Sequence, residues 1–310
     1  CASSKKSMMG DKRSTALSAP IVAAMLTITI TFSLFWKHIS DDAALQTQTV
    51  QRTVYYRFQV RNTTNRPVVN AHFFVHAPAA HTTTQHCASI QSSPAHEMTI
   101  ASTGNRMLKF TFENFPPYAT KTIDIRATLL LGTTPDKKIG SAPHQPAGQA
   151  PNVANGKDEI HRLAAQQKAE SVFATANNLY HWVADHVHYS GYDRKSKGAY
   201  RTLRSRKGDC TEFADLFVAL ARAANIPARR VSGYLCPNTG ILRPVDYHDW
   251  AEFYHDGIWR LVDAQQRNFD TRYHHYIVMQ IDDLSSSNKS ASASNRFYVD
   301  DKGLTVKMES

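Results

Sequence analysis

The sequence predicts an α+β protein, in which an antiparallel β-sandwich precedes a mixed helix-and-strand domain and follows an N-terminal transmembrane helix. Three observations predict this fold class. Residues 16–36 form a long uncharged apolar run, and residues 53–131 alternate apolar and polar side chains in short stretches. After residue 172 the pattern changes to helical i, i+3, i+4 spacing, followed by a hairpin signature.

The apolar run from Ala16 to Trp36 is long enough to span a bilayer, for which about 20 residues suffice. Basic residues precede the run and acidic residues follow it, so the positive-inside rule places the N-terminus in the cytoplasm. We therefore expect residues 1–45 to be a cytoplasmic tip and a single-pass anchor, with the rest extracytoplasmic, on the periplasmic side. A cleaved signal peptide is the alternative, but the run is long for one and no A-x-A-type site directly follows it.

Residues 50–132 are predicted to form the β-sandwich. Leu108, Phe110 and Phe112 alternate with polar residues, and a second alternating run follows at 123–127. Turn signals rich in Pro, Gly and Asn separate the runs at the intervals expected of short antiparallel strands. No catalytic pattern is present in this part of the sequence.

The remaining chain divides by composition. Residues 133–158 lack periodicity and are predicted to be a linker, whereas apolar residues from Val172 to Val187 recur at helical spacing. The second domain is predicted to cover residues 159–283. Residues 284–310 are predicted to be a low-complexity spacer followed by a C-terminal strand or hairpin.

The formal net charge of +10 comes in large part from one segment that contains no acidic residue. This basic segment comprises Arg194, Lys195, Lys197, Arg201, Arg204, Arg206 and Lys207. Its residues do not alternate with aromatic residues as in a base-stacking groove, so no nucleic-acid partner is expected. The alternatives left open are a solvated loop and a role in binding a substrate carboxylate or favouring a thiolate.

The four cysteines, at positions 1, 87, 210 and 236, form no CxxC pair and have no metal-like spacing. This excludes a disulfide scaffold, although one bridge between Cys87 and Cys236 stays open. We expect no metal and no cofactor.

Cys210 is predicted to be the first residue of a helix. Asp209 and Glu212 have the spacing of a capping box, apolar residues follow on one face, and Asn225-Ile226-Pro227 ends the helix. Free N–H groups and the positive end of the macrodipole favour a thiolate at this position. The two acids oppose that effect, so the dipole alone does not activate the cysteine.

A β-hairpin is predicted for residues 248–263, with Asp256-Gly257 as its two-residue turn. In this register Asp263 lies opposite Trp250 and diagonally beside His248, about 7–8 Å away between backbones. Glu252 shares the face but lies about 13 Å from His248 along the strand. A three-residue turn would weaken the pairing of His248 with Asp263.

A nucleophilic cysteine needs a base, and the base needs an orienting group. The helix start and the hairpin supply these as Cys210, His248 and Asp263. We therefore predict Cys210 as the nucleophile, His248 as its base and Asp263 as the residue that orients the histidine.

With these residues in view, the chain resembles the transglutaminase-like superfamily of papain-like thiol enzymes. Three segments carry the resemblance, namely GAYRTLRSRKGDC at 198–210, GDCTEFADLFVALARAANIPARRVSGY at 208–234 and HDWAEFYHDGIWRLVDAQ at 248–265. The resemblance implies a papain-like catalytic domain in which these three residues act in the order nucleophile, base and acid. The sequence differs from the calcium-dependent crosslinking members of this superfamily, because it has no Asp/Asn-rich loop of the kind that binds calcium.

The implied chemistry is attack by the Cys210 thiolate on an amide carbonyl of a peptide or protein, giving an acyl-enzyme. The backbone N–H of Cys210 is expected to stabilise the oxyanion. Spacing does not decide between Trp182 and Tyr189 as a second donor, and core packing is the alternative for both. Trp250 and Arg204 are further candidates for oxyanion or substrate contacts.

Several alternatives stay open. Cys210 could be a structural thiol with no catalytic role. A metal could bind to histidines, which stand at positions 181, 186, 188, 274 and 275. The domain could also be a non-catalytic binding or assembly module. Within the enzyme reading, the acyl-enzyme is released to water or to another amine, and the sequence does not decide between them. It predicts no oligomeric state.

Overall fold

The computed structural model describes residues 48–101, 104–137, 157–193, 196–282 and 296–310. The predicted membrane anchor at 16–36 lies outside these residues, as do most of the predicted linker and the low-complexity spacer. Across the described ranges, no helix has the length and apolar character needed to cross a membrane.

The first sheet is built on two long neighbouring strands, β1 (Thr49–Asn62) and β6 (Thr120–Gly132), which pair antiparallel. β3 (Gln85–Ser93) extends the sheet beyond β6. Two strands from the later part of the chain join β1, which are β16 (Leu304–Met308) in antiparallel and β10 (Gly240–Ile241) in parallel pairing.

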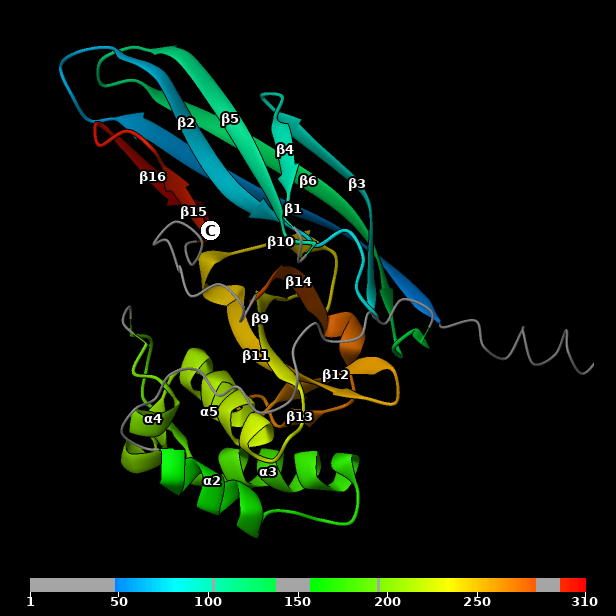
Figure 1. The fold of residues 1–310 in the computed structure, drawn as a ribbon. Helices are drawn as coiled ribbons and strands as arrows, with labels where there is room; N and C mark the ends of the chain where they lie inside the picture. The colour runs from blue at the N-terminus through cyan, green and yellow to red at the C-terminus, as the bar shows by residue number, and fades with distance from the viewer. Residues whose placement is uncertain (1–47, 102–103, 138–156, 194–195, 283–295) are drawn as a thin grey trace, which may run out of the picture. The chain divides into compact units, whose positions relative to one another are not determined.

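The second sheet has the order β15 (Phe297–Val299), β2 (Val68–Ala77), β5 (Arg106–Phe115) and β4 (Glu97–Ile100), and all its pairs are antiparallel. The alternation predicted for β5 is confirmed, since Leu108, Phe110 and Phe112 are buried. Apolar side chains from both sheets form one hydrophobic core, so residues 49–132 contribute most of the antiparallel β-sandwich that the sequence predicts. Figure 1 shows these strands together.

The third sheet has the order β13 (Asn268–Phe269), β12 (Ile258–Asp263), β11 (Tyr247–His255), β9 (Ala228–Leu235) and β14 (Tyr276–Ile281). Four helices pack with it: α2 (Lys157–Gln166), α3 (Val172–His186), α4 (Ala199–Ser205) and α5 (Cys210–Ala223). Helix α5 lies against β11, where Phe217 shares a core cluster with Ala251 and Phe253.

The third sheet continues into the sandwich through its strands β9 and β14. Tyr234, Ile277 and Met279 belong to the sandwich core. The side chain of Gln85 donates to the carbonyl of Val278 at 3.0 Å and accepts from its N–H at 2.9 Å. Residues 47–310 accordingly form one compact unit.

Three expectations can now be compared with the structure. The basic segment is not a loop throughout, because residues 199–205 form α4, and α2 begins at Lys157, inside the predicted linker. Cys87 and Cys236 are both free and buried, so the bridge left open between them is not formed. Burial raises the pKa of both thiols.

Candidate active site

The hairpin formed by β11 and β12 has the predicted register. Ile258 pairs with His255, and Val262 pairs with Ala251. Asp256 and Gly257 both have positive φ, at 52° and 82°, as a two-residue type I′ turn requires. This register places Asp263 at the end of β12 near His248 at the start of β11.

His248 and Asp263 form a buried pair. Nε2 of His248 lies 2.7 Å from Oδ2 of Asp263, and the two residues are 5% and 2% exposed. Asp263 also accepts hydrogen bonds from the N–H of Gln266 at 3.0 Å and from the hydroxyl of Tyr276 at 2.9 Å. Asn268 in turn donates to the Tyr276 hydroxyl at 3.1 Å. The carboxylate is therefore fixed from three directions.

Cys210 begins helix α5 and is partly buried. The predicted capping box is confirmed, because Oδ1 of Asp209 accepts from the N–H of Thr211 at 2.9 Å, while Oε2 of Glu212 accepts from the N–H of Asp209 at 3.0 Å. A Cβ at Gly208 would lie 2.3 Å from Cβ of Glu212, so this turn requires glycine.

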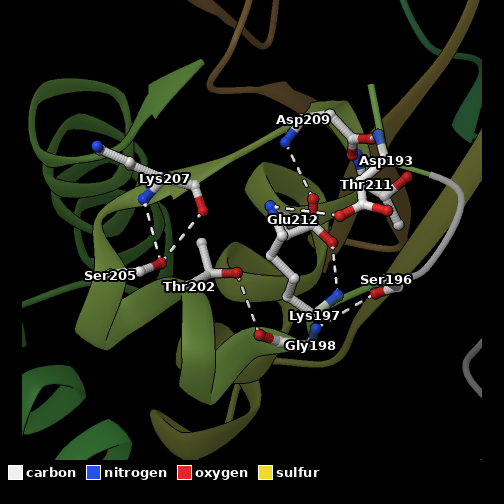
Figure 2. A network of polar contacts seen from close by, with 10 residues as sticks. All are labelled: Asp193, Ser196, Lys197, Gly198, Thr202, Ser205, Lys207, Asp209, Thr211 and Glu212. Carbon is white, nitrogen blue, oxygen red and sulfur yellow. Dashed lines mark hydrogen bonds and ion pairs between the residues drawn. The ribbon is translucent and has the colours of Figure 1, made fainter. Parts of the chain in front are cut away.

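The second oxygen of each capping carboxylate holds a neighbouring segment, as Figure 2 shows. Oδ2 of Asp209 accepts from the N–H of Asp193 at 3.0 Å, and Oε1 of Glu212 accepts from the N–H of Lys197 at 2.8 Å. Burial, together with the contact with the Asp209 side chain, raises the pKa of Glu212, although the N–H groups of Asp209 and Lys197 oppose the shift. The start of α5 is thus joined to the segment that precedes α4.

His248 links the helix start to the hairpin. Its side chain hydrogen-bonds Cys210 as well as Asp263. Since Nε2 faces Asp263, Nδ1 is the nitrogen available to the thiol. Burial would lower the pKa of His248, but the hydrogen bonds and charges of Asp263 and Cys210 outweigh it and raise the pKa to about 10. Near neutral pH the imidazole therefore carries its proton and a positive charge.

This geometry lies within a segment with known relatives. Residues 161–264, which contain Cys210, His248 and Asp263, match the family model of the transglutaminase-like superfamily. The chain contains a transglutaminase-like domain. No curated protein sequence is significantly similar to the chain.

One solved structure has a similar fold over most of the chain, and two others align less well. A candidate cysteine protease from Cytophaga hutchinsonii aligns with a TM-score of 0.51 and 19% identity, over 84% of this chain and 92% of that chain. The periplasmic domain of TgpA from Pseudomonas aeruginosa aligns with 14% identity and a TM-score of 0.35, over 71% and 88% of the two chains. LapG from Legionella pneumophila aligns with 12% identity and a TM-score of 0.34, over 42% and 82%.

Glu252, the other acid on the hairpin face, pairs with an arginine of the neighbouring strand and not with His248. Its carboxylate lies 2.6 Å from the guanidinium of Arg229, directly across the strand pair. That guanidinium also covers the ring of Trp259 at 3.9 Å. Glu252 therefore forms an ion pair with Arg229. It does not pair with His248, as expected from the distance between the two residues along the strand.

The four further candidates lie in different places. Tyr189 ends the short strand β7 (His188–Tyr189), pairs with Gly208 two residues before Cys210, and is 58% exposed. Core packing is therefore not its role. Trp182 packs against Arg206 at 4.2 Å and against His186 at 4.7 Å between ring centroids.

Trp250 is buried, whereas Arg204 lies at the surface. Trp250 is 1% exposed and packs edge-on against Tyr276 at 5.1 Å, because its position on β11 faces the core beneath the sheet. Arg204 points from α4 to Glu159 of α2, at 3.2 Å. The expectation of a direct substrate contact is therefore wrong for Trp250, which packs in the core, while for Arg204, in its surface ion pair, it stays a prediction.

Sequence reasoning missed Tyr276, which donates to Asp263, and Asn268, which donates to Tyr276. Neither stands in a motif, and the only signal is that Tyr276 begins a run of apolar residues that forms β14. Among the described residues, no three His, Cys, Asp or Glu side chains are grouped as metal ligands.

Proposed function

We propose that this chain is a cysteine-dependent enzyme that acts on amide bonds of peptides or proteins through an acyl-enzyme on Cys210. The observation that carries the proposal is the buried His248 side chain, which contacts both Cys210 and Asp263. Thiol acyl transfer requires a nucleophile, a base in contact with it and an acid that orients the base.

The first half-reaction follows from the protonated His248. The Cys210 thiolate attacks the amide carbon, and a C–S bond forms as the carbonyl oxygen becomes an oxyanion. His248 then gives its proton to the amide nitrogen, the C–N bond breaks, and the free amine leaves. Asp263 stabilises the imidazolium before this transfer and fixes the ring orientation.

The oxyanion is placed at the start of α5. The first N–H groups of a helix have no acceptor within the helix, so the Cys210 N–H is available to the oxyanion. Tyr189 is the better placed candidate for a second donor or substrate contact, because its strand pairs with the segment just before Cys210.

In the second half-reaction the neutral imidazole removes a proton from the attacking water or amine. A new C–O or C–N bond forms, the C–S bond breaks, and the Cys210 thiolate and the protonated His248 are regenerated. Water as acceptor gives peptidase, amidase or deamidase activity, and an amine gives transamidation. Both outcomes use the same residues of this chain.

The predicted location is part of the same proposal. The uncharged run at 16–36 and the charges around it support a single-pass anchor with the enzyme on the extracytoplasmic side. Peptides or proteins of the cell envelope are then the accessible substrates.

The deciding experiment is mass spectrometry of a glutamine-containing peptide library incubated with the protein, with and without a primary amine. A loss of ammonia with gain of water shows deamidation, cleavage shows peptidase activity, and addition of the amine shows transamidation. Cys210→Ala must abolish every product. Unchanged peptides in all reactions would overturn the proposal in favour of a binding module.

A second measurement does not require a substrate. Iodoacetamide is expected to alkylate Cys210 faster than Cys87 or Cys236 near neutral pH, because burial raises the pKa of the other two thiols. Equal, slow labelling of all three would indicate a structural thiol at position 210.

A further inference from the structure

A second polar contact lies directly beside the contact of Cys210 with His248. Thr211 follows Cys210 on α5, and Asp249 follows His248 on β11. The hydroxyl of Thr211 donates to Oδ2 of Asp249 at 2.7 Å, a short distance typical of hydrogen bonds to a charged acceptor. The helix start and the strand are therefore joined twice, at consecutive residues.

The apolar packing of α5 on the sheet cannot replace this hydrogen bond. Phe217 packs in one cluster with Ala251 and Phe253, which holds the helix against the strand. Such contacts are non-directional, so they allow small shifts of the helix along β11. A hydrogen bond fixes both distance and angle.

A further tie lies one turn along the same helix. Asp215 follows Thr211 by four residues, so both lie on one face of α5. Arg230 of β9 donates to Oδ1 of Asp215 at 2.9 Å and also pairs with Asp282 at 2.6 Å. Burial opposes the charge of Arg230, but Asp215, Asp282 and Asp249 together raise its pKa. Helix α5 is thus joined to the inner strands β11 and β9 by two polar contacts, and the contact of Thr211 is the one next to the thiol.

We propose that Asp249 is a positioning residue that acts through Thr211 to set the distance between the Cys210 sulfur and the His248 ring. The inference rests on the proposed function, since it concerns the geometry of that thiol and imidazole. Asp249 itself faces away from His248, because adjacent residues of a strand point to opposite faces. Its effect on the pair is therefore mediated by the backbone of both elements.

The test compares Thr211→Val, which removes the hydroxyl at nearly constant volume, with Thr211→Ser, which keeps it. Thr202→Val is the matched control, because the Thr202 hydroxyl also makes one hydrogen bond, to the carbonyl of Gly198 at 3.1 Å within the α4 region. Asp249→Ala removes the same hydrogen bond by changing its acceptor on β11. This variant tests the proposal if Thr211→Val does not fold.

The readouts are the iodoacetamide alkylation rate of Cys210 at pH 6 relative to pH 9, and the imidazole titration of His248 by NMR. We expect Thr211→Val and Asp249→Ala to lower the rate ratio by about threefold or more, since small misplacements of reacting groups cost large factors in rate. The pKa of His248 should fall below about 10, because the hydrogen bond and charge of Cys210 contribute to raising it. Thr211→Ser and Thr202→Val should match the wild type in both measurements.

The outcomes separate this inference from the proposed function. Fast alkylation of wild-type Cys210 with unchanged values in Thr211→Val and Asp249→Ala would overturn the positioning role and leave the enzyme proposal intact. Slow alkylation of the wild type at pH 6 would overturn the proposed function itself.

Discussion

At the scale of the residue, the charge of His248 depends on Asp263. The imidazole is almost fully buried, and burial alone favours its neutral form. Asp263 reverses this preference through a hydrogen bond and its charge, and Tyr276 and the backbone of Gln266 hold the carboxylate in place. In the proposed mechanism the proton stored in this way is the one that the leaving amine receives.

Asp263→Asn should therefore lower the pKa of His248 from about 10, because the amide keeps an acceptor oxygen but loses the negative charge. Below this pKa the ring is protonated, so the alkaline limb of kcat/KM should move to lower pH and activity at pH 9 should fall more than at pH 6. NMR titration of the imidazole measures the shift. Glu252→Gln is the control, because Glu252 pairs with Arg229, and an equal shift there would show that the wrong acid was chosen.

Tyr276→Phe tests the residue behind Asp263. It removes one hydrogen bond to a carboxylate, of the kind worth about 1.5–3 kcal/mol, so kcat/KM should fall about tenfold with little change in KM. Tyr273→Phe is the matched control, because the Tyr273 hydroxyl donates to Asp270 instead and is equally buried. If both variants lost the same activity, a general packing effect would explain the result.

At the scale of the element, the site depends on close contact between strands. Gly233 of β9 lies between His248 of β11 and Val278 of β14. A Cβ at this position would lie 1.8 Å from the carbonyl oxygen of Ile277 and 3.0 Å from the ring of Trp250. The strand that flanks His248 can therefore approach β14 only because residue 233 has no side chain.

Gly233→Ala should destabilise the protein by about 1–3 kcal/mol, as is typical of overpacking, and should also reduce activity because β9 must move beside His248. Thermal unfolding and kcat/KM measure the two effects. Gly240→Ala is the control, because nothing lies within 4 Å of a Cβ there and its φ is not positive. A Gly233→Ala protein with wild-type melting temperature and activity would contradict this account of the strand spacing.

The elements that the sequence predicts well are those fixed by local signals. Asp256-Gly257 sets the hairpin register, and the capping box of Asp209 and Glu212 sets the start of α5, so Cys210 and the hairpin pair follow from neighbouring residues. The hydrogen bond from Tyr276 to Asp263 could not be predicted from neighbouring residues. It depends on the antiparallel pairing of β14 with β9, which no turn or spacing encodes.

At the scale of the whole molecule, residues 157–282, which include the transglutaminase-like segment, share their interior with the sandwich. Their apolar residues Tyr234, Leu242, Ile277 and Met279 are buried in the sandwich core. β10 from the same segment pairs with β1, and the C-terminal strands β15 and β16 return to both sandwich sheets. These contacts are long-range, which is why the sequence suggested separable parts.

A protein limited to residues 157–282 should therefore not fold stably. Exposing four large apolar side chains costs about 1.5–3 kcal/mol each, or about 6–12 kcal/mol in total, which is comparable with the usual net stability of about 5–15 kcal/mol. The fragment should lack a cooperative thermal transition, and its Cys210 should be alkylated no faster than its Cys236. Residues 47–310 should melt in one transition that includes both parts, because the core is continuous. A fragment that melts cooperatively at the temperature of the longer protein would show that residues 157–282 do not depend on the sandwich.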